Sequence, residues 1–187
     1  MSMRRRLRPR LLVVYALLAA LLWYARPSAL SLASGLLPIT LGEALRIWAT
    51  GHLHKNDALT LSGPYAYLRN PLYLGTMLIG IGFALVAAAP LAYGVLVIFL
   101  VGYFGYYMPY KDRIESARLE ALYGDAYRRY AVAVPSLLPR LHAYVPLSAD
   151  ERPRPNWSVR FRDNNELGTA LAVLSVVLLL VARWSLG

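Results

Sequence analysis

The chain alternates between long apolar stretches and short polar connections. A helix needs about 20 mostly apolar residues to cross the hydrocarbon core of a bilayer. Stretches that approach this length lie at residues 11–25, 29–49, 72–88, 91–110 and 167–183. The second stretch carries Pro38, Glu43 and Arg46, so we expect its inner half to pack against protein or to lie near the interface. The pattern predicts an all-α, polytopic integral membrane protein with about five membrane helices.

Composition supports a membrane protein. Hydrophobic residues make up 58% of the 187 residues and charged residues only 16%, which leaves too little polar surface for a soluble domain of this size. The opening segment, residues 1–10, carries five arginines and no acidic residue before the first apolar stretch. Because no convincing small-residue cleavage site follows, we interpret this segment as the start of a retained signal-anchor helix.

The charges predict which side of the membrane each connection occupies. Basic residues near the ends of spans favour the cytoplasm, and they gather in the N-terminus, in the 50–71 connection and in the 111–166 segment. These three parts are therefore predicted to be cytoplasmic. The net charge of +10 then indicates contact with anionic membrane lipids and no nucleic-acid partner. Eighteen arginines against two lysines suggest a GC-rich bacterial genome, and hence a bacterial inner membrane.

Two of the cytoplasmic segments carry residues suited to chemistry. The connection "GHLHKNDALTLSGPYAYLRNP" is rich in turn-forming residues, and Pro71 at its end is placed to start the next span. The second segment predicts a cytoplasmic helix, because one side of it carries residues at spacings of three or four, namely Glu115, Leu119, Tyr123, Tyr127 and Tyr130. The chain has no cysteine, and His52 and His54 have no third ligand nearby, so we expect no metal site.

Together these segments carry a resemblance that covers about Leu41 to Pro139. "LGEALRIWATGHLHKNDALTLSGPYAYLRNPLYLGTMLIGIGF", followed by "RIESARLEALYGDAYRRYAVAVPSLLP", resembles the isoprenylcysteine carboxyl methyltransferase and phospholipid methyltransferase superfamily. The first part of the family signature is matched by Gly63, Tyr65, Arg69, Asn70, Pro71, Tyr73 and Gly75. The second part is matched by Glu115, Leu119, Gly124, Tyr127 and Tyr130, with Tyr123 as the aromatic residue.

The resemblance implies methyl transfer from S-adenosylmethionine to a lipophilic acceptor, either an isoprenylcysteine-type carboxylate or a lipid headgroup. In that role Arg69 would hold the cofactor carboxylate through a two-donor fork, and Glu115 would accept hydrogen bonds from the ammonium or the ribose. We take these two as the catalytic residues. The cofactor-binding residues that it implies are Gly63, Tyr65, Arg69, Asn70, Pro71, Tyr73, Glu115, Leu119, Tyr127 and Tyr130.

Two positions depart from the family pattern. Asn70 stands where many members have histidine, so an imidazole cannot act there in this chain. Ser116 replaces the second glutamate of the Glu-Glu pair, which leaves the cofactor role to Glu115 alone. Gly80 and Gly82 fit either close approach to a cofactor or ordinary packing between membrane helices.

Other interpretations stay open at this point. A nicotinamide-dependent membrane reductase of sterol-reductase-like architecture, or a membrane scaffold without enzymatic activity, would carry similar helices. Arg69 alone fits a positive-inside anchor, and Tyr103, Tyr106, Tyr107 and Tyr110 fit an interfacial aromatic belt.

We expect one methyltransferase domain over residues 1–187. It comprises membrane helices in 1–50, the core in 51–139, and a cytoplasmic segment with a final membrane helix in 140–187. The sequence does not indicate an oligomeric state.

Overall fold

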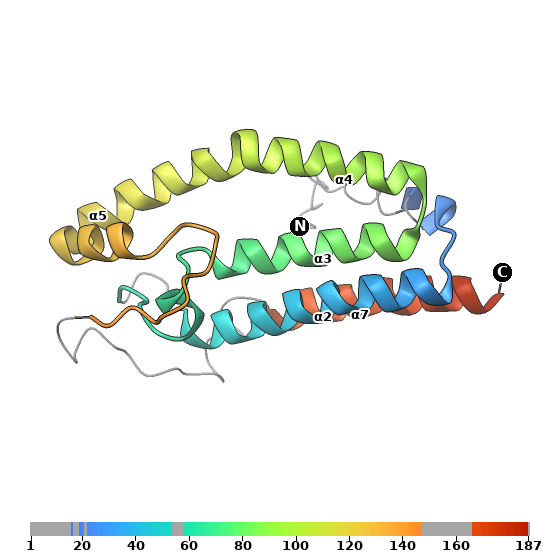
Figure 1. The fold of residues 1–187 in the computed structure, drawn as a ribbon, viewed down its shortest axis with the longest axis horizontal. Coiled ribbons are helices and arrows are strands. Elements are labelled where there is room, and N and C mark those ends of the chain that lie inside the picture. Colours follow the sequence, from blue (N-terminus) through green and yellow to red (C-terminus); the bar gives the residue numbers. More distant parts are fainter. Residues whose placement is uncertain (1–15, 17–18, 21, 54–57, 147–165, 187) are drawn as a thin grey trace, which may run out of the picture.

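The computed structural model describes residues 16, 19–20, 22–53, 58–146 and 166–186, and within these ranges it contains helices and no strands. The main helices are α2 (Ala29–His52), α3 (Pro71–Ala87), α4 (Pro90–Gly102), α5 (Met108–Ala133) and α7 (Glu166–Leu186). Figure 1 shows α2, α3 and α7 side by side along the long axis, with α4 and α5 forming a long arm above them. The predicted all-α class is confirmed, whereas most of the expected span at 11–25 lies outside the described residues.

Within the described part of the chain, three helices are long and apolar enough to cross a membrane: α2, α7 and a 44-residue helical run from Pro90 to Ala133. The helix α3 is a shorter apolar helix. The long run joins α4 to α5 through one π-helical turn, η2 (Tyr103–Tyr107). At about 1.5 Å per residue, the part of this run before Gly124 is longer than a hydrocarbon core is thick. The expected fourth span therefore continues into the first part of the expected cytoplasmic helix, and α5 extends beyond the apolar bundle.

Glycines bring α2 and α3 into close contact. A Cβ on Gly35 would lie 2.5 Å from the Gly82 carbonyl oxygen, and a Cβ on Gly42 would lie 2.5 Å from the Gly75 carbonyl oxygen. Small residues of this kind let the backbones of membrane helices approach. Gly82 is thus a helix-packing residue, which accounts for it without a cofactor.

Arg46 on α2 has polar partners inside the bundle. Arg46 pairs with Glu166 through two hydrogen bonds, Nε to Oε1 at 2.9 Å and Nη2 to Oε2 at 3.0 Å. Its Nη1 also donates to Thr76 Oγ1 at 2.7 Å. The side chains of Arg46 and Glu166 are only 14% and 2% exposed. These contacts connect α7 to α2 and α3. They explain how Arg46 is accommodated in the second apolar stretch, whose inner half was expected to pack against protein or to lie near the interface.

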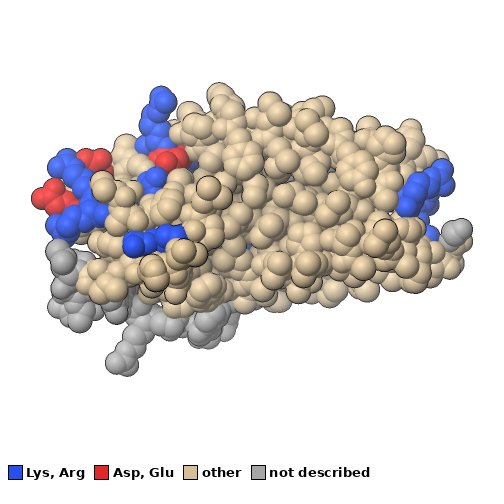
Figure 2. Space-filling model, viewed as in Figure 1, with Lys and Arg blue, Asp and Glu red and all other residues tan. Residues whose placement is uncertain are grey.

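The charged surface is divided between the two ends of the molecule. On the face shown in Figure 2, lysine and arginine side chains lie toward both ends, acidic side chains lie only toward the end formed by α5, and a broad uncharged band separates the two ends. The end formed by α5 also holds the turn before α3 (Figure 1). This is the end at which the polar signature residues meet.

Candidate functional site

The turn before α3 depends on the backbone conformation of Gly63. This residue has φ +59° and opens a short 3₁₀ helix, η1 (Gly63–Ala66). A Cβ at this position would lie 2.5 Å from the imidazole ring of His52. His52 Nδ1 lies 2.9 Å from Ser62 Oγ, a hydrogen-bond distance. Glycine is therefore required here both by its positive φ and by the packing of His52 against it.

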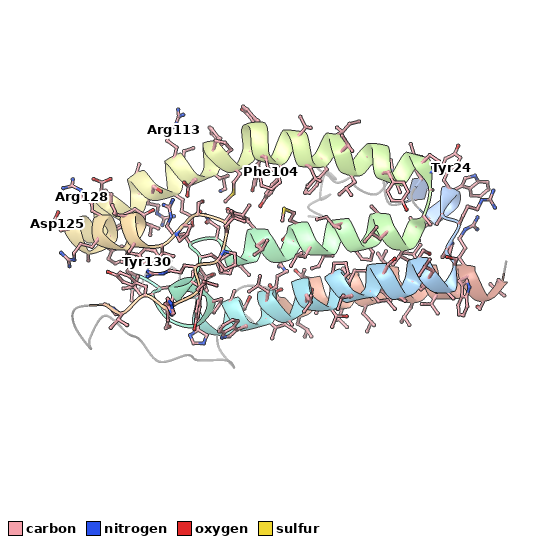
Figure 3. All side chains as sticks on the ribbon, viewed as in Figure 1. Tyr24, Phe104, Arg113, Asp125, Arg128 and Tyr130 are labelled. Atoms are coloured by element: carbon pink, nitrogen blue, oxygen red, sulfur yellow. The ribbon has the colours of Figure 1, made fainter. Side chains whose placement is uncertain are left out.

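The helix α5 reverses direction near its end. Gly124 has φ 52° and ψ −126°, so the segment after it folds back toward the turn before α3. Figure 3 shows Arg128 and Asp125 at the outer end of α5, with Tyr130 on the folded-back part near the rest of the chain. Tyr130 is only 3% exposed, and its hydroxyl donates to the Tyr65 carbonyl oxygen at 2.8 Å. The reversal thereby brings the second half of the signature to the first.

The segment after α5 runs along the same turn. Backbone N–H groups of Arg69 and Asn70 donate to the carbonyl oxygens of Pro135 and Ser136 at 2.8 Å and 3.0 Å. Further along, the Tyr144 N–H donates to the Ala66 carbonyl oxygen at 2.8 Å. The segment after α5 therefore fixes the backbone of the turn.

These elements enclose a cavity of about 390 Å³. Among the described residues its walls carry two cationic and two acidic side chains, from Arg69, Arg118, Asp112 and Glu115, and the formal charges of these four cancel. The remaining lining residues are polar, aromatic or apolar: Leu53, Ala58, Leu59, Thr60, Tyr65, Asn70, Leu72, Ser116, Leu119, Leu122, Tyr123, Tyr127 and Tyr130. An apolar pocket with a few convergent charged groups is typical of a small-molecule site.

Arg69 lies at the centre of the polar wall. Its Nη1 donates to Ser116 Oγ at 3.3 Å and to the Tyr127 hydroxyl at 3.2 Å, and its Nη2 donates to Asp112 Oδ2 at 3.3 Å. The side chain is 17% exposed. Its Nε is buried and has no hydrogen-bond partner among the described residues. A buried donor of this kind costs free energy until an acceptor pairs with it.

Asp112 joins the site without having been singled out by sequence analysis. Its Oδ1 accepts hydrogen bonds from Asn70 Nδ2 at 3.4 Å and from Ser136 Oγ at 3.2 Å. Asn70 Nδ2 also donates to Ser136 Oγ at 2.9 Å. The available signal was helical spacing, because Asp112 lies three residues before Glu115 and four before Ser116 on the face toward the cavity.

The structure brings most of the predicted cofactor-binding residues to this cavity. Those that line it are Tyr65, Arg69, Asn70, Glu115, Leu119, Tyr127 and Tyr130. Gly63 and Pro71 do not line it: the first forms the turn, and the second is fully buried at the start of α3. Tyr73 also lies elsewhere, against a groove between α3 and the α4–η2 arm.

This second hollow has an aromatic lining. It measures about 510 Å³ and is lined by Tyr73, Thr76, Ile98, Phe99, Gly102, Tyr103 and Tyr107. The ring of Tyr73 lies 6.1 Å from that of Tyr107 and 6.5 Å from that of Tyr103. Tyr103 is only 7% exposed, whereas Tyr106 is 72% exposed. Of the tyrosines expected to form an interfacial belt, the exposed Tyr106 fits that role, whereas Tyr103 packs inside the protein.

The phenol of Tyr65 is neutral at physiological pH. Its side chain is only 7% exposed. This burial raises the pKa of Tyr65, and the nearby Tyr130 hydroxyl and Glu115 carboxylate raise it further. Tyr65 can therefore offer a phenol ring and an O–H donor, but it cannot serve as a base near pH 7.

Comparison with known proteins identifies the family. The chain is 28% identical over 149 residues to the cobalt-zinc-cadmium resistance protein CzcN of Cupriavidus metallidurans; the match covers 72% of this chain and 63% of that relative's length. No solved structure matches it significantly. The model of the phospholipid methyltransferase family matches residues 29–126, which is more than half of the chain and includes the cavity residues from Leu53 to Tyr123. The chain belongs to the phospholipid methyltransferase family.

Proposed function

We propose that this chain is an S-adenosylmethionine-dependent methyltransferase that acts on a lipophilic acceptor at the cytoplasmic surface of a bacterial inner membrane. The observation that carries the proposal is Arg69, which lines the cavity together with Glu115 and buried tyrosines and whose buried Nε has no hydrogen-bond partner among the described residues. Family membership supports methyl transfer in general. The cavity supports a zwitterionic small molecule as the partner.

The residues present fit the amino-acid end of S-adenosylmethionine. The carboxylate of that end needs a cationic donor, and Arg69 has an Nε–H with no protein acceptor. Its ammonium needs an anion, and Glu115 lines the same cavity without a hydrogen bond or ion pair to the described residues. Tyrosine rings in the lining can pack against adenine or face the sulfonium through cation–π attraction. Arg69 and Glu115 are therefore proposed to act as the charged clamp of the site.

When bound, S-adenosylmethionine supplies an electrophilic methyl group. The chain then has to hold the acceptor in line and to exclude water, and alignment of this kind can provide much of the acceleration. No histidine lines the cavity among the described residues, and Tyr65 stays protonated. The remaining candidate bases among the described lining residues are the carboxylates of Glu115 and Asp112, which the proposal assigns to the cofactor ammonium and to Arg69. The site favours an acceptor that is already nucleophilic, such as a carboxylate, over an amine that must first lose a proton.

The aromatic groove supports access of the acceptor from the bilayer. It lies against α3 and the α4–η2 arm, both of which are apolar, and Tyr73 on its wall is only four residues after Arg69. Four residues of helix correspond to about one turn. An amphiphilic acceptor would place its headgroup near the cavity while its chain stays among apolar side chains. We therefore propose an isoprenylcysteine-type carboxylate or a lipid headgroup as the substrate class.

A ligand titration tests the cofactor. Purified protein in detergent is titrated with S-adenosylmethionine, S-adenosylhomocysteine and NADPH by isothermal calorimetry. We expect saturable binding of the two adenosyl ligands and none of NADPH. Binding of NADPH alone would favour a reductase, and binding of no ligand would favour a scaffold; either result would overturn the proposal.

An acceptor series tests the substrate class. Methyl transfer is measured with acceptors that share one carboxylate headgroup and differ in prenyl or acyl length. We expect turnover to rise with chain length, because a longer chain partitions into the bilayer beside the groove. Equal or faster turnover of the short, water-soluble analogue would contradict access from the membrane.

A further inference from the structure

The carboxylate of Asp112 accepts hydrogen bonds from three other residues in or beside the cavity wall. It faces Arg69 with one carboxylate oxygen, at 3.3 Å from Nη2, and Asn70 and Ser136 with the other, at 3.4 Å and 3.2 Å. These partners come from the turn before α3 and from the segment after α5. Asp112 therefore joins three separate parts of the chain at the point where Arg69 enters the cavity.

Arg69 depends on Asp112 for its only charged partner among the described residues. Its other contacts, Ser116 Oγ and the Tyr127 hydroxyl, are neutral acceptors on Nη1. All three hydrogen bonds have an ionised donor, but the contact with Asp112 is also an ion pair, so Coulomb attraction between opposite charges adds to it. Because Asn70 and Ser136 fix the carboxylate in turn, its position sets the plane of the guanidinium and hence the direction of the Nε–H.

Ser116 lies one helical turn after Asp112 and also contacts Arg69. Its Oγ is 3.3 Å from Arg69 Nη1 and 2.7 Å from the Tyr127 hydroxyl, which donates to it. Both residues line the cavity. A carboxylate at position 112 contacts Nη2 of Arg69, and a carboxylate at position 116 would reach Nη1 of the same guanidinium.

We propose that Asp112 is the positioning residue of the cofactor site: it holds Arg69 with the Nε–H directed to a ligand carboxylate, and a carboxylate at position 116 can take over this task. The inference rests on the proposed function, since Arg69 must bind the carboxylate of the cofactor. Asp112 itself does not contact the ligand. Its loss would leave the cavity in place but allow the guanidinium to turn.

Three ligands separate this role from direct binding. S-adenosylhomocysteine has the complete amino-acid end, its analogue without the α-amino group keeps only the carboxylate, and 5′-methylthioadenosine has neither group. If Asp112 acts through Arg69, Asp112→Asn weakens binding of the first two ligands about tenfold, equivalent to about 1.4 kcal/mol, and leaves the third unchanged. If Asp112 instead held the ammonium directly, the deaminated analogue would bind the variant as well as it binds the wild type, and the proposal would be wrong.

A charge relocation provides the decisive variant. The combination of Asp112→Ser with Ser116→Glu should restore S-adenosylhomocysteine binding to within about threefold of the wild type. Asp125→Asn is the matched control, because Asp125 is on the same helix with a 79% exposed side chain and, among the described residues, forms its ion pair with Arg128. It should bind all three ligands like the wild type.

Folding is monitored by the binding of 5′-methylthioadenosine, which does not need the clamp. If Asp112→Asn does not fold, the relocated variant still decides: binding of S-adenosylhomocysteine supports the proposal, and binding of 5′-methylthioadenosine alone overturns it. Unchanged or tighter binding of S-adenosylhomocysteine by a folded Asp112→Asn protein also overturns it. If the wild type binds none of the three ligands, the proposed function fails, and this inference fails with it.

Discussion

Replacing Arg69 with alanine removes the cationic half of the proposed clamp. The substitution deletes the unpartnered Nε–H and the donors to Ser116, Tyr127 and Asp112. A hydrogen bond to a charged group contributes about 1.5 to 3 kcal/mol. The affinity for S-adenosylmethionine should therefore fall by about 10- to 150-fold. Glu115→Ala should lower this affinity by a similar factor, because it removes the acceptor for the ammonium or ribose of the cofactor.

The assay is calorimetric titration of each variant in the same detergent, with circular dichroism to check helix content. Arg128→Ala is the matched control, because Arg128 also lies on the α5 end but is 64% exposed and pairs with Glu120 and Asp125 instead of lining the cavity. It should bind like the wild type. Wild-type affinity in both Arg69→Ala and Glu115→Ala would refute the assignment of the site.

Further predictions concern folding and orientation. Gly63→Ala should lower stability by about 1 to 2 kcal/mol because φ is +59°, and Gly105→Ala, where nothing lies within 4 Å of a new Cβ, should not; equal melting temperatures would contradict this. Glu166→Gln should destabilise the bundle by about 3 kcal/mol because Arg46 loses its buried partner, whereas the exposed Glu120→Gln should unfold like the wild type. In the cysteine-free chain, Asp125→Cys should react with a membrane-impermeant maleimide only after permeabilisation, and Arg26→Cys should react from outside; the reverse pattern would invert the topology.

Much of the fold follows from the apolar pattern. Long apolar runs can satisfy their backbone groups in a membrane only as helices, so the class was determined by composition and length. The pattern did not reveal that the fourth span continues into the helix that we expected to be cytoplasmic; the two are joined because Tyr103–Tyr107 forms a π-helical turn instead of a break. Nor did it reveal the reversal at Gly124, because a glycine inside a helical pattern indicates loosening but not a direction.

The site was predictable where a motif existed. Arg69, Glu115 and Tyr130 were singled out by the resemblance, and all three line the same cavity. Asp112 was missed because it lies outside the motif and gains its meaning only from contacts with Asn70 and Ser136, which the chain reversal brings to it. Conversely, Pro71 and Gly63 belong to the motif for backbone reasons, so a sequence signature alone does not separate residues that shape a turn from residues that face a ligand.

Transfer of a labelled methyl group tests the central claim most directly. The wild type and Arg69→Ala are reconstituted in liposomes that contain a prenylcysteine carboxylate and a bacterial lipid extract, with the α5 end of the protein facing the external solution. S-adenosylmethionine labelled in its methyl group is then added to that solution. The account predicts that label moves into the organic-extractable fraction with the wild type and falls at least about tenfold with Arg69→Ala. Label that stays in the aqueous phase with the wild type, although the protein binds the cofactor, would contradict a lipophilic acceptor. Label that transfers equally with Arg69→Ala would contradict the site.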